Sequence, residues 1–335
     1  MGSSDSQPVR NMDKRTARRE YRDQFEAGCI NYREEHANEL CTIDSEFEKE
    51  TKQHQNININ GHNKSKIHVF ARKRPVFQHE IDDGEFDCVT CLKGGITTIH
   101  DARMRNDMIN QYMKHNEFKF HHSFSELDSN TTVYRGAASP LARHTVLNSG
   151  HSTCMVYGQT GSGKTFTMTS VYEQACIEIF QLIDEKKMSF EENSKPIPKI
   201  TVSVSFIEVA GDTCHDLFNN FNTVQLAPGA DDSFHAYPIV EPIVTTAEEC
   251  FALIMYGCGA RATAATGVHD ASSRSHAILR VYVRCGESTT ARHSNKPGDC
   301  TEGVFTMVDL AGSEHRIDSM YHSAARRKEG AQINA

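Results

Sequence analysis

Hydrophobic and polar positions along this chain predict strands and helices that follow one another in turn. Apolar residues at every second position, or in short continuous runs, are typical of strands. Such segments occur at residues 66–72, 153–157, 199–210, 276–285 and 303–310. Apolar residues at helical spacing occur at 133–146, 172–185 and 246–257. Because strands that alternate with helices usually form parallel sheets, we predict an α/β fold with a central, mostly parallel sheet and helices on both faces.

Two connections complete this pattern. Residues 84–100 contain Gly94 and Gly95, which favour a turn, and the segment predicts a small strand pair. Residues 286–298 are polar and are typical of a hairpin loop between two strands.

The amino-terminal segment differs from the rest in composition. The segment from Arg10 to Arg22 contains six basic residues, two acidic residues and no helix breaker, which predicts an exposed charged helix. Residues 34–51 are acidic and polar, and 55–63 are of low complexity. We therefore expect a neck or linker, partly helical or disordered, at residues 1–63 and a globular domain at 64–335. The basic helix is either a solvated face or a positive handle for an acidic partner, and the sequence leaves both open.

A phosphate-binding motif lies between the strand at 153–157 and the helix that follows. Glycines there let consecutive backbone N–H groups point at a phosphate, and the positive end of the helix adds to the attraction. Lys164 is expected to reach the outer phosphates, and the Thr165 hydroxyl to bind Mg²⁺. The motif predicts a nucleotide-binding P-loop NTPase fold. Its residues are Gly158, Gln159, Thr160, Gly161, Ser162, Gly163, Lys164 and Thr165.

Two further loops have the chemistry of a nucleotide site. Asp309 ends a buried strand and precedes Gly312, as expected for a carboxylate that holds Mg²⁺ and a backbone N–H that senses a γ-phosphate. The run 272–276 is rich in hydroxyls and contains Arg274, whose guanidinium can pair with an acid such as Glu314. Three such elements in this order favour a shared site over separate turns.

Composition limits the function further. The chain has 335 residues, a net charge of −8 and 11 cysteines without disulfide-framework spacing. A net negative charge argues against a general DNA- or RNA-binding protein, and the cysteine pattern suits a reducing compartment. Cys88 and Cys91 are spaced as in a zinc site, but no second pair lies at zinc-finger spacing, so we do not expect them to bind a metal. Because no signal peptide or apolar run of 18 residues occurs, we expect a soluble intracellular protein that does not bind membranes.

Four motifs together resemble the nucleotide-contacting signatures of the kinesin motor domain. They occur in the family's order, and the resemblance covers about residues 64–334. It implies a kinesin-type P-loop fold, a microtubule-stimulated ATPase that uses ATP and Mg²⁺, tubulin as partner, and a cytoplasmic, microtubule-associated location that includes the spindle. It leaves open a homodimer formed through regions outside the motor. The motifs are Arg72-Lys73-Arg74-Pro75, Gly158 to Thr165, Ser272 to His276 and Asp309 to Glu314.

The resemblance also implies a role for each matching residue. The adenine would be surrounded by Arg72, Arg74, Pro75 and Tyr134, and the phosphates would be held by Gly158 to Thr165. The Mg²⁺ site would comprise Thr165, Ser273 and Asp309. Ser272 would position the attacking water, Arg274 and Glu314 would form a bridge that closes the site, and Gly312 would sense the γ-phosphate.

Within the family, the chain looks most similar to the internal-motor subfamily, kinesin-13, whose members depolymerise microtubule ends. The Arg-Lys-Arg-Pro motif, Val133-Tyr134-Arg135 and the long insert near Arg105-Asn106-Asp107 are the similar features. The match ends at Glu329 to Asn334, at the start of the helix after the second switch, so we expect a motor domain truncated there.

Two alternatives remain open. The family usually has Asn where this chain has His269, which favours a microtubule-associated protein that binds nucleotide but hydrolyses it weakly or not at all. Residues 295–299 resemble a guanine-reading motif of GTPases, but they have one residue too many and precede Asp309 instead of following it.

Overall fold

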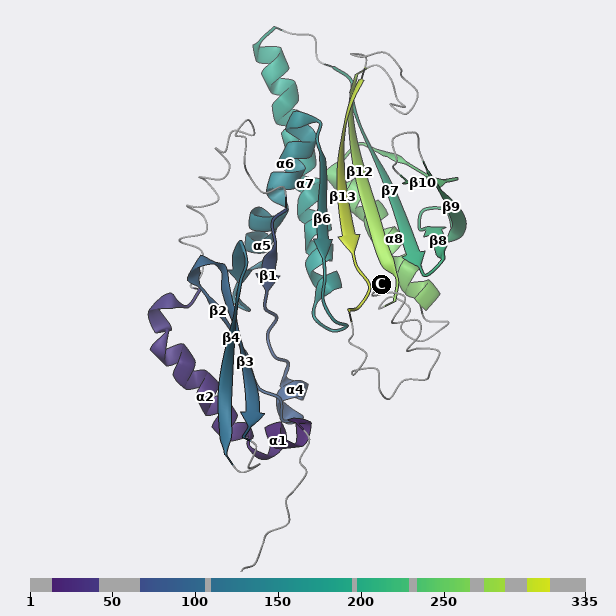
Figure 1. Cartoon of the computed structure of the whole chain (residues 1–335). Helices are drawn as coiled ribbons and strands as arrows, with labels where there is room; N and C mark the ends of the chain where they lie inside the picture. Colours follow the sequence, from purple (N-terminus) through teal and green to yellow (C-terminus); the bar gives the residue numbers. More distant parts are fainter. Residues whose placement is uncertain are drawn as a thin grey trace, which may run out of the picture. The chain divides into compact units, whose positions relative to one another are not determined.

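The computed structural model describes residues 14–41, 67–105, 110–194, 198–228, 234–265, 274–286 and 300–313 (Figure 1). The chain forms two compact units, which are residues 1–129 and 130–335. The sequence-predicted boundary near residue 64 lies outside the described residues. The described helices before residue 64 pack on strands that follow residue 64, as described next.

The first unit combines two small sheets with helices from the amino-terminal segment. Strands β2, β3 and β4 form an antiparallel sheet, and β1 pairs with β5 in parallel. The β2–β3 pair confirms the strand pair predicted around Gly94 and Gly95. The elements are α1 (Lys14–Glu20), α2 (Arg22–Glu35), η1 (Ala37–Glu39), β1 (Phe70–Arg72), α4 (Gln78–Asp82), β2 (Val89–Leu92), η2 (Lys93–Gly95), β3 (Ile96–Met104), β4 (Gln111–Lys119) and β5 (His122–Phe124).

Helix α2 is attached to the three-stranded sheet through one apolar stripe. Phe25, Cys29 and Tyr32 are buried and recur at helical spacing, while the rest of the helix is mainly charged and polar. Phe25 and Cys29 pack with Phe86 and Ala102 in a small core. The predicted basic helix therefore has a break at Tyr21 and continues as a docked helix as far as Glu35.

The second unit holds the large sheet and the long helices. The predicted helix at 133–146 is divided in two, with Pro140 in the first turn of the second half, where proline is tolerated. The elements are α5 (Asn130–Ala137), α6 (Ser139–Asn148), β6 (His151–Val156), α7 (Lys164–Glu192), β7 (Ile200–Ala210), β8 (Thr213–Asp216), β9 (Asn222–Pro228), β10 (Phe234–Tyr237), β11 (Ile243–Val244), α8 (Ala247–Ala265), β12 (His276–Gly286) and β13 (Cys300–Asp309).

The large sheet is mixed, which corrects the prediction of a mostly parallel one. Its order is β10-β9-β8-β7-β12-β13-β6, with β11 paired to β7. Among the described strands of this sheet, β6 and β13 form the parallel pair, whereas β7, β8, β9 and β10, β11 on β7, and β12 with both neighbours, are antiparallel. The reason lies in the connections. A short turn joins β7 to β8, and the loop predicted as a hairpin joins β12 to β13, so these neighbours run in opposite directions.

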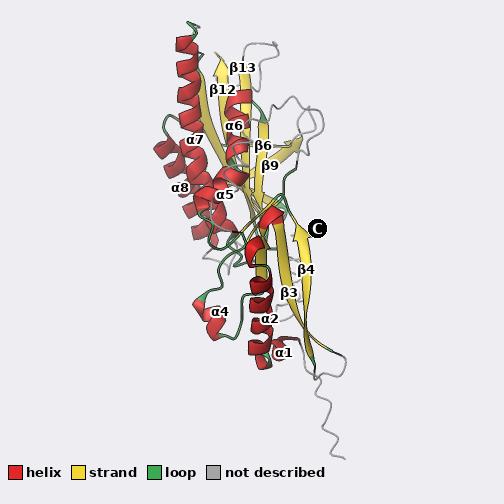
Figure 2. Cartoon of the chain, turned by 90° about the vertical axis from the view of Figure 1, so that its left-hand side faces the viewer, coloured by secondary structure: helices red, strands yellow, loops and turns green. Residues whose placement is uncertain are grey.

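Helices α6, α7 and α8 pack on the same face of this sheet (Figure 2). That face presents Leu279, Val281, Phe305 and Met307, which share a buried core with residues such as Met168 of α7. The described part of this unit therefore has its packed helices on one face, where the sequence predicted both. No helix in the described ranges is long and apolar enough to cross a bilayer.

Candidate functional site

The phosphate-binding motif has the predicted strand, loop and helix. Strand β6 ends at Val156, and α7 begins at Lys164 and runs for 29 residues. Gly161 and Gly163 have φ angles of 78° and 92°, which side chains other than glycine rarely adopt. Gly158 has a φ angle of 159°, and a Cβ there would lie 2.6 Å from Ser162 Oγ, so a side chain at this position would force the serine to move. The loop therefore places the positive end of a long helix at its mouth, which suits an anion.

Lys164 lies over this loop. Its Nζ donates hydrogen bonds to the carbonyl oxygens of Gly158, at 2.8 Å, and Gln159, at 2.9 Å. The ammonium group is thus held against the phosphate loop, and its contact with the outer phosphates stays a prediction.

Two of the predicted Mg²⁺ ligands are in direct contact. Thr165 Oγ1 donates to Asp309 Oδ2 at 2.8 Å, across 144 positions of sequence. The contact arises because β13 runs parallel to β6, with Asp309 opposite Val156, so both strands end at the same edge of the sheet. Asp309 Oδ1 is buried and has no hydrogen-bond partner within the described residues. An orphaned carboxylate oxygen beside a threonine hydroxyl suits a Mg²⁺ ion with its bound waters.

The segment after Asp309 is tied to the phosphate loop by backbone hydrogen bonds. Leu310 N–H donates to Val156 O at 3.3 Å, and Ser313 N–H donates to Gly158 O at 3.1 Å. Ala311 N–H donates to His276 Nδ1 at 3.1 Å. Gly312, the predicted γ-phosphate sensor, therefore lies in a short stretch whose neighbours on both sides are held in place.

Sequence reasoning missed Arg261, which organises the buried side of this site. From α8, its guanidinium donates to Asp309 Oδ2 at 3.1 Å, to Glu208 Oε1 at 3.1 Å and to Ser275 O at 2.8 Å. Ser275 Oγ also donates to Glu208 Oε1. All four residues are buried. The signal in the sequence was a charged residue within each of two largely apolar segments, Glu208 in β7 and Arg261 in α8. Charged residues in such segments are rarely buried unless they pair with each other.

The switch residues are described only in part. Arg274 lies half-buried immediately before β12. Its predicted partner Glu314, together with Ser272, Ser273 and His269, lies outside the described residues. The bridge that would close the site stays a prediction. Next to Arg274, burial lowers the pKa of His276, and the charge of Arg261 acts in the same direction.

In the first unit, Arg74 is paired with a carboxylate six residues away. It makes two hydrogen bonds to Glu80, at 2.7 and 2.5 Å, and one to Pro75 O at 2.8 Å. Its guanidinium lies 4.7 Å from the centre of the Phe77 ring. Arg72 is half-buried, and desolvation lowers its pKa. Arg72, Arg74 and Pro75 thus lie close together at the end of β1, and their predicted role at the adenine stays a prediction.

Tyr134, in the second unit, is placed as a core residue. It is buried between α5 and α7, and its hydroxyl donates to Glu178 Oε2 at 2.7 Å. Ser139 Oγ donates to the other oxygen of the same carboxylate at 2.8 Å. Burial, together with the Glu178 charge, raises the pKa of Tyr134. This placement explains Tyr134 as part of the packing of three helices and lends no support to an adenine contact.

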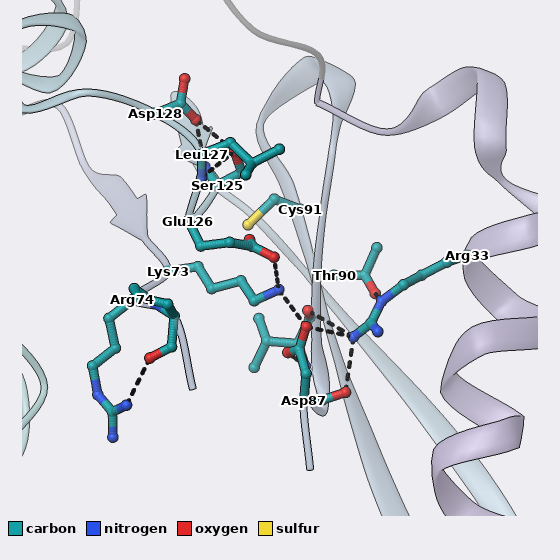
Figure 3. Close-up of polar contacts among 12 residues, drawn as sticks. Arg33, Lys73, Arg74, Asp87, Thr90, Cys91, Ser125, Glu126, Leu127 and Asp128 are labelled. Carbon is teal, nitrogen blue, oxygen red and sulfur yellow. Dashed lines mark hydrogen bonds and ion pairs between the residues drawn. The ribbon is translucent and has the colours of Figure 1, made fainter. Parts of the chain in front are cut away.

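Lys73 and the cysteine pair Cys88 and Cys91 make contacts within the first unit. Lys73, next to Arg74, donates to Asp87 Oδ2 at 2.7 Å and to Glu126 Oε1 at 2.8 Å (Figure 3). Cys91 donates to Phe124 O at 3.5 Å, whereas Cys88 packs against the core that contains Phe25. The two thiols thus serve separate contacts, and the described ranges contain no group of three or more His, Cys, Asp or Glu side chains placed to hold a metal ion.

One residue of the predicted insert, Arg105, is described, whereas several other segments singled out in the sequence are not. Arg105 follows β3 and lies 5.9 Å from the centre of the Tyr112 ring. Asn106, Asp107, the GTPase-like residues 295–299 and the carboxyl-terminal segment 329–334 lie outside the described residues.

Comparison with protein families decides the ancestry. The family model described as the kinesin motor domain matches residues 72–335. The chain belongs to the kinesin family. A solved structure titled as that of a fast kinesin matches with a TM-score of 0.65 and 25% identity, covering 80% of this chain and 71% of that one. The predicted P-loop fold of kinesin-motor type is therefore confirmed.

Curated relatives of this kinesin domain are longer proteins. Diatom spindle kinesin-1 of Cylindrotheca fusiformis is 31% identical over 81% of this chain. The kinesin-like protein KIF24 of Homo sapiens is 32% identical over 80% of it. The aligned region spans 40% of the diatom protein and 19% of the human one.

Proposed function

We propose that this kinesin chain is a microtubule-stimulated ATPase that binds ATP with Mg²⁺ and couples its hydrolysis to tubulin binding. The observation that carries the proposal is the contact between Thr165 and Asp309 beside the phosphate loop, with one oxygen of Asp309 left unpaired. A phosphate loop alone would support nucleotide binding. A hydroxyl and a carboxylate that meet at its mouth support the metal-dependent chemistry of nucleotide hydrolysis.

The chain's own residues supply the binding and positioning. The backbone N–H groups of Gly161 to Thr165 and the Lys164 ammonium bind the phosphates, while Thr165 and Asp309 hold Mg²⁺. A Mg²⁺ ion held by these residues would neutralise the negative charge of the phosphates. Ser273 would complete the metal site, and Ser272 would orient the attacking water in line with the γ-phosphate. Arg274 and Glu314 close the site around it. Most of the rate then comes from positioning and charge stabilisation.

Coupling to tubulin follows from the segment around Gly312. Ser313 is hydrogen-bonded to Gly158 of the phosphate loop, and Ala311 to His276 at the start of β12. Contact between the γ-phosphate and the Gly312 N–H holds this segment, and its loss on hydrolysis releases the segment and the residues that follow it. The state of the nucleotide is thereby transmitted to the tubulin-binding surface.

We further propose that the motor is of the internal, microtubule-depolymerising type. The paired nine-residue strands β3 and β4, with Arg105 following β3, support this proposal because the subfamily has its insert at this point. We place the protein in the cytoplasm on microtubules, and the similarity to a protein named for the spindle supports a spindle role. Partners other than tubulin, such as nucleic acid or membrane, are not part of the proposal; a homodimer formed outside the motor is compatible with it.

The test is ATP hydrolysis by the purified chain in a single turnover, with and without microtubules. We expect microtubules to accelerate hydrolysis, and stabilised microtubules to shorten from their ends in a separate assay by light microscopy. Glu314→Ala should retain nucleotide binding and lose turnover, because its predicted bridge forms as the site closes. Equal loss of binding and turnover in this variant would contradict the assigned role.

A second function is favoured by His269 in place of the family's usual Asn. In this alternative the chain binds nucleotide tightly and attaches to microtubules without efficient hydrolysis. Tight ATP binding with no hydrolysis in the single-turnover experiment would support it. The variant His269→Asn would then be expected to restore turnover.

A further inference from the structure

Helix α2 is fastened to the β2–β3–β4 sheet by polar contacts as well as by its apolar stripe. At its carboxyl-terminal end, the Arg33 guanidinium donates to Asp87 O at 2.8 Å and forms an ion pair with Asp87 Oδ2 at 3.0 Å (Figure 3). Arg33 Nε donates to Thr90 Oγ1 at 3.0 Å. Arg33 therefore ties the helix to β2 and to the residues before it.

The hydrogen bonds continue from Thr90 through two imidazoles. Thr90 Oγ1 lies 2.8 Å from His100 Nε2, and His100 Nδ1 lies 2.7 Å from His115 Nδ1. Thr90 and His100 are fully buried, and His100 and His115 face each other across β3 and β4.

One direction of this chain of hydrogen bonds gives every buried hydrogen a partner. Arginine can only donate, so the Thr90 oxygen accepts from Arg33, and the single Thr90 hydrogen finds an acceptor when it points to His100 Nε2. His100 then carries its single hydrogen on Nδ1 and donates it to His115 Nδ1. All members are satisfied when both imidazoles are neutral.

His100 and His115 also pack against the ring of Tyr32, the last buried aromatic residue of α2. The centre of its ring lies 4.5 Å from that of His115, 4.8 Å from that of His100 and 4.1 Å from that of His36. The Tyr32 hydroxyl lies 3.2 Å from Thr98 Oγ1 and donates to Glu117 Oε1 at 3.2 Å. The position of Tyr32 therefore depends on the geometry of the histidine pair.

An added proton is incompatible with this arrangement. A proton on His115 Nδ1 would oppose the hydrogen on His100 Nδ1. If His100 instead shifted its hydrogen to Nε2, it would donate toward Thr90, and the Thr90 hydrogen would lose its buried acceptor. We propose that the His100–His115 pair is a proton-sensitive latch, which holds α2 on the sheet at neutral pH and releases it when the pair takes up a proton.

The charges around the pair determine the pH range. Burial lowers the pKa of His100 from 6.5 to about 4, and His115, Arg33 and Lys73 act in the same direction while Asp87 opposes them. In the released state the group returns toward its ordinary value. Docking is therefore fully favoured above about pH 6.5 and weakens as the pH falls toward 4, by on the order of 100-fold. The titratable and charged groups that face the pair or Tyr32 are Arg33 and His36 of α2, Glu39 of η1, Lys73, Asp87, and Glu117 of β4.

Hydrogen–deuterium exchange of the full chain tests the latch, with rates corrected for the intrinsic effect of pH. We expect amides of residues 22–35 to lose at least 10-fold of their protection between pH 7.5 and pH 5.0, while α7 stays protected. His100→Gln should abolish this change, because it removes the imidazole whose pKa differs between the docked and the released state.

His36→Gln is the matched control. His36 also stacks on Tyr32, but its Nδ1 contacts the Tyr32 carbonyl within the same helix and is outside the chain of hydrogen bonds. This variant should keep the pH response. The proposal is overturned if α2 is equally protected at both pH values, if His100→Gln responds like the unmodified chain, if His36→Gln also abolishes the response, or if α2 and α7 lose protection together. None of these outcomes depends on ATP hydrolysis, so the latch stands or falls separately from the proposed function.

Discussion

Charged side chains at the phosphate loop are shared among distant elements, whereas Arg74, shortly after β1, is paired within one short segment. Asp309 accepts hydrogen bonds from Thr165, 144 residues away, and from Arg261, 48 residues away. Arg74 is paired with Glu80, six residues away. The first arrangement exists only when α7, α8 and β13 are assembled. The second belongs to a single turn of chain, so it adds little to the stability of the whole fold.

Loss of Lys164 should have the largest effect on the long-range site. Lys164→Ala removes the ammonium held over the Gly158 and Gln159 carbonyls, so we expect ATP affinity to fall by at least about 100-fold. Titration with a fluorescent ATP analogue measures this. The control is Lys187→Ala, an exposed lysine on the same helix, which should bind normally. Retained affinity in Lys164→Ala would contradict the assignment of the loop.

Arg261→Met tests whether the buried cluster needs its cation. Two buried carboxylates, Glu208 and Asp309, would lose their partner, which costs about 3–5 kcal/mol of the free energy of unfolding. Urea unfolding monitored by circular dichroism measures the change. Arg143→Met removes an exposed arginine with a weak contact to Glu178 and should cost less than about 1 kcal/mol. Similar losses in the free energy of unfolding of both variants would show that the buried cluster does not need its cation more than an exposed ion pair does.

Thr165 should affect turnover more than binding. Thr165→Val keeps the shape but removes the hydroxyl that contacts Asp309, so we expect about 10- to 100-fold slower ATP hydrolysis with a smaller change in ATP affinity. Thr165→Ser keeps a hydroxyl and should recover most of the rate. The comparison at several Mg²⁺ concentrations shows whether the metal is involved, and a rate independent of Mg²⁺ in all three proteins would argue against that role.

The locally paired region should give the smallest effect. Hydrogen bonds from Arg74 lower the pKa of Glu80 from 4.5 to about 2. A depressed carboxyl pKa adds stability above pH 4.5 that is lost as the pH falls through 2. We expect Glu80→Gln to remove this part of the acid dependence and to change stability at pH 7 only slightly, because the pair is partly exposed. A large loss at pH 7 would show that this segment also takes part in long-range packing.

Many features of both regions could be predicted without the structure. The strand, loop and helix around Gly158–Thr165 follow from glycine spacing and apolar runs, and Asp309 from its position after a buried strand. Strand direction was predicted wrongly for most of the large sheet, although the polar loop at 286–298 had been recognised as a hairpin, which already requires β12 and β13 to be antiparallel. The role of Arg261 was missed because its partners are far away in sequence.

The sequence by itself determined the family, the phosphate loop and the chemical type of its neighbours, because local spacing dictates backbone geometry and because residue type dictates what can bind a phosphate or Mg²⁺. Only the tertiary structure decided which of these residues meet. Thr165 contacts Asp309 because β6 and β13 are parallel neighbours, and Tyr134 is buried against Glu178 because α5 packs on α7. Contacts of this kind depend on strand order and helix packing, which arise from the burial of apolar surface over the whole unit and not from any single motif.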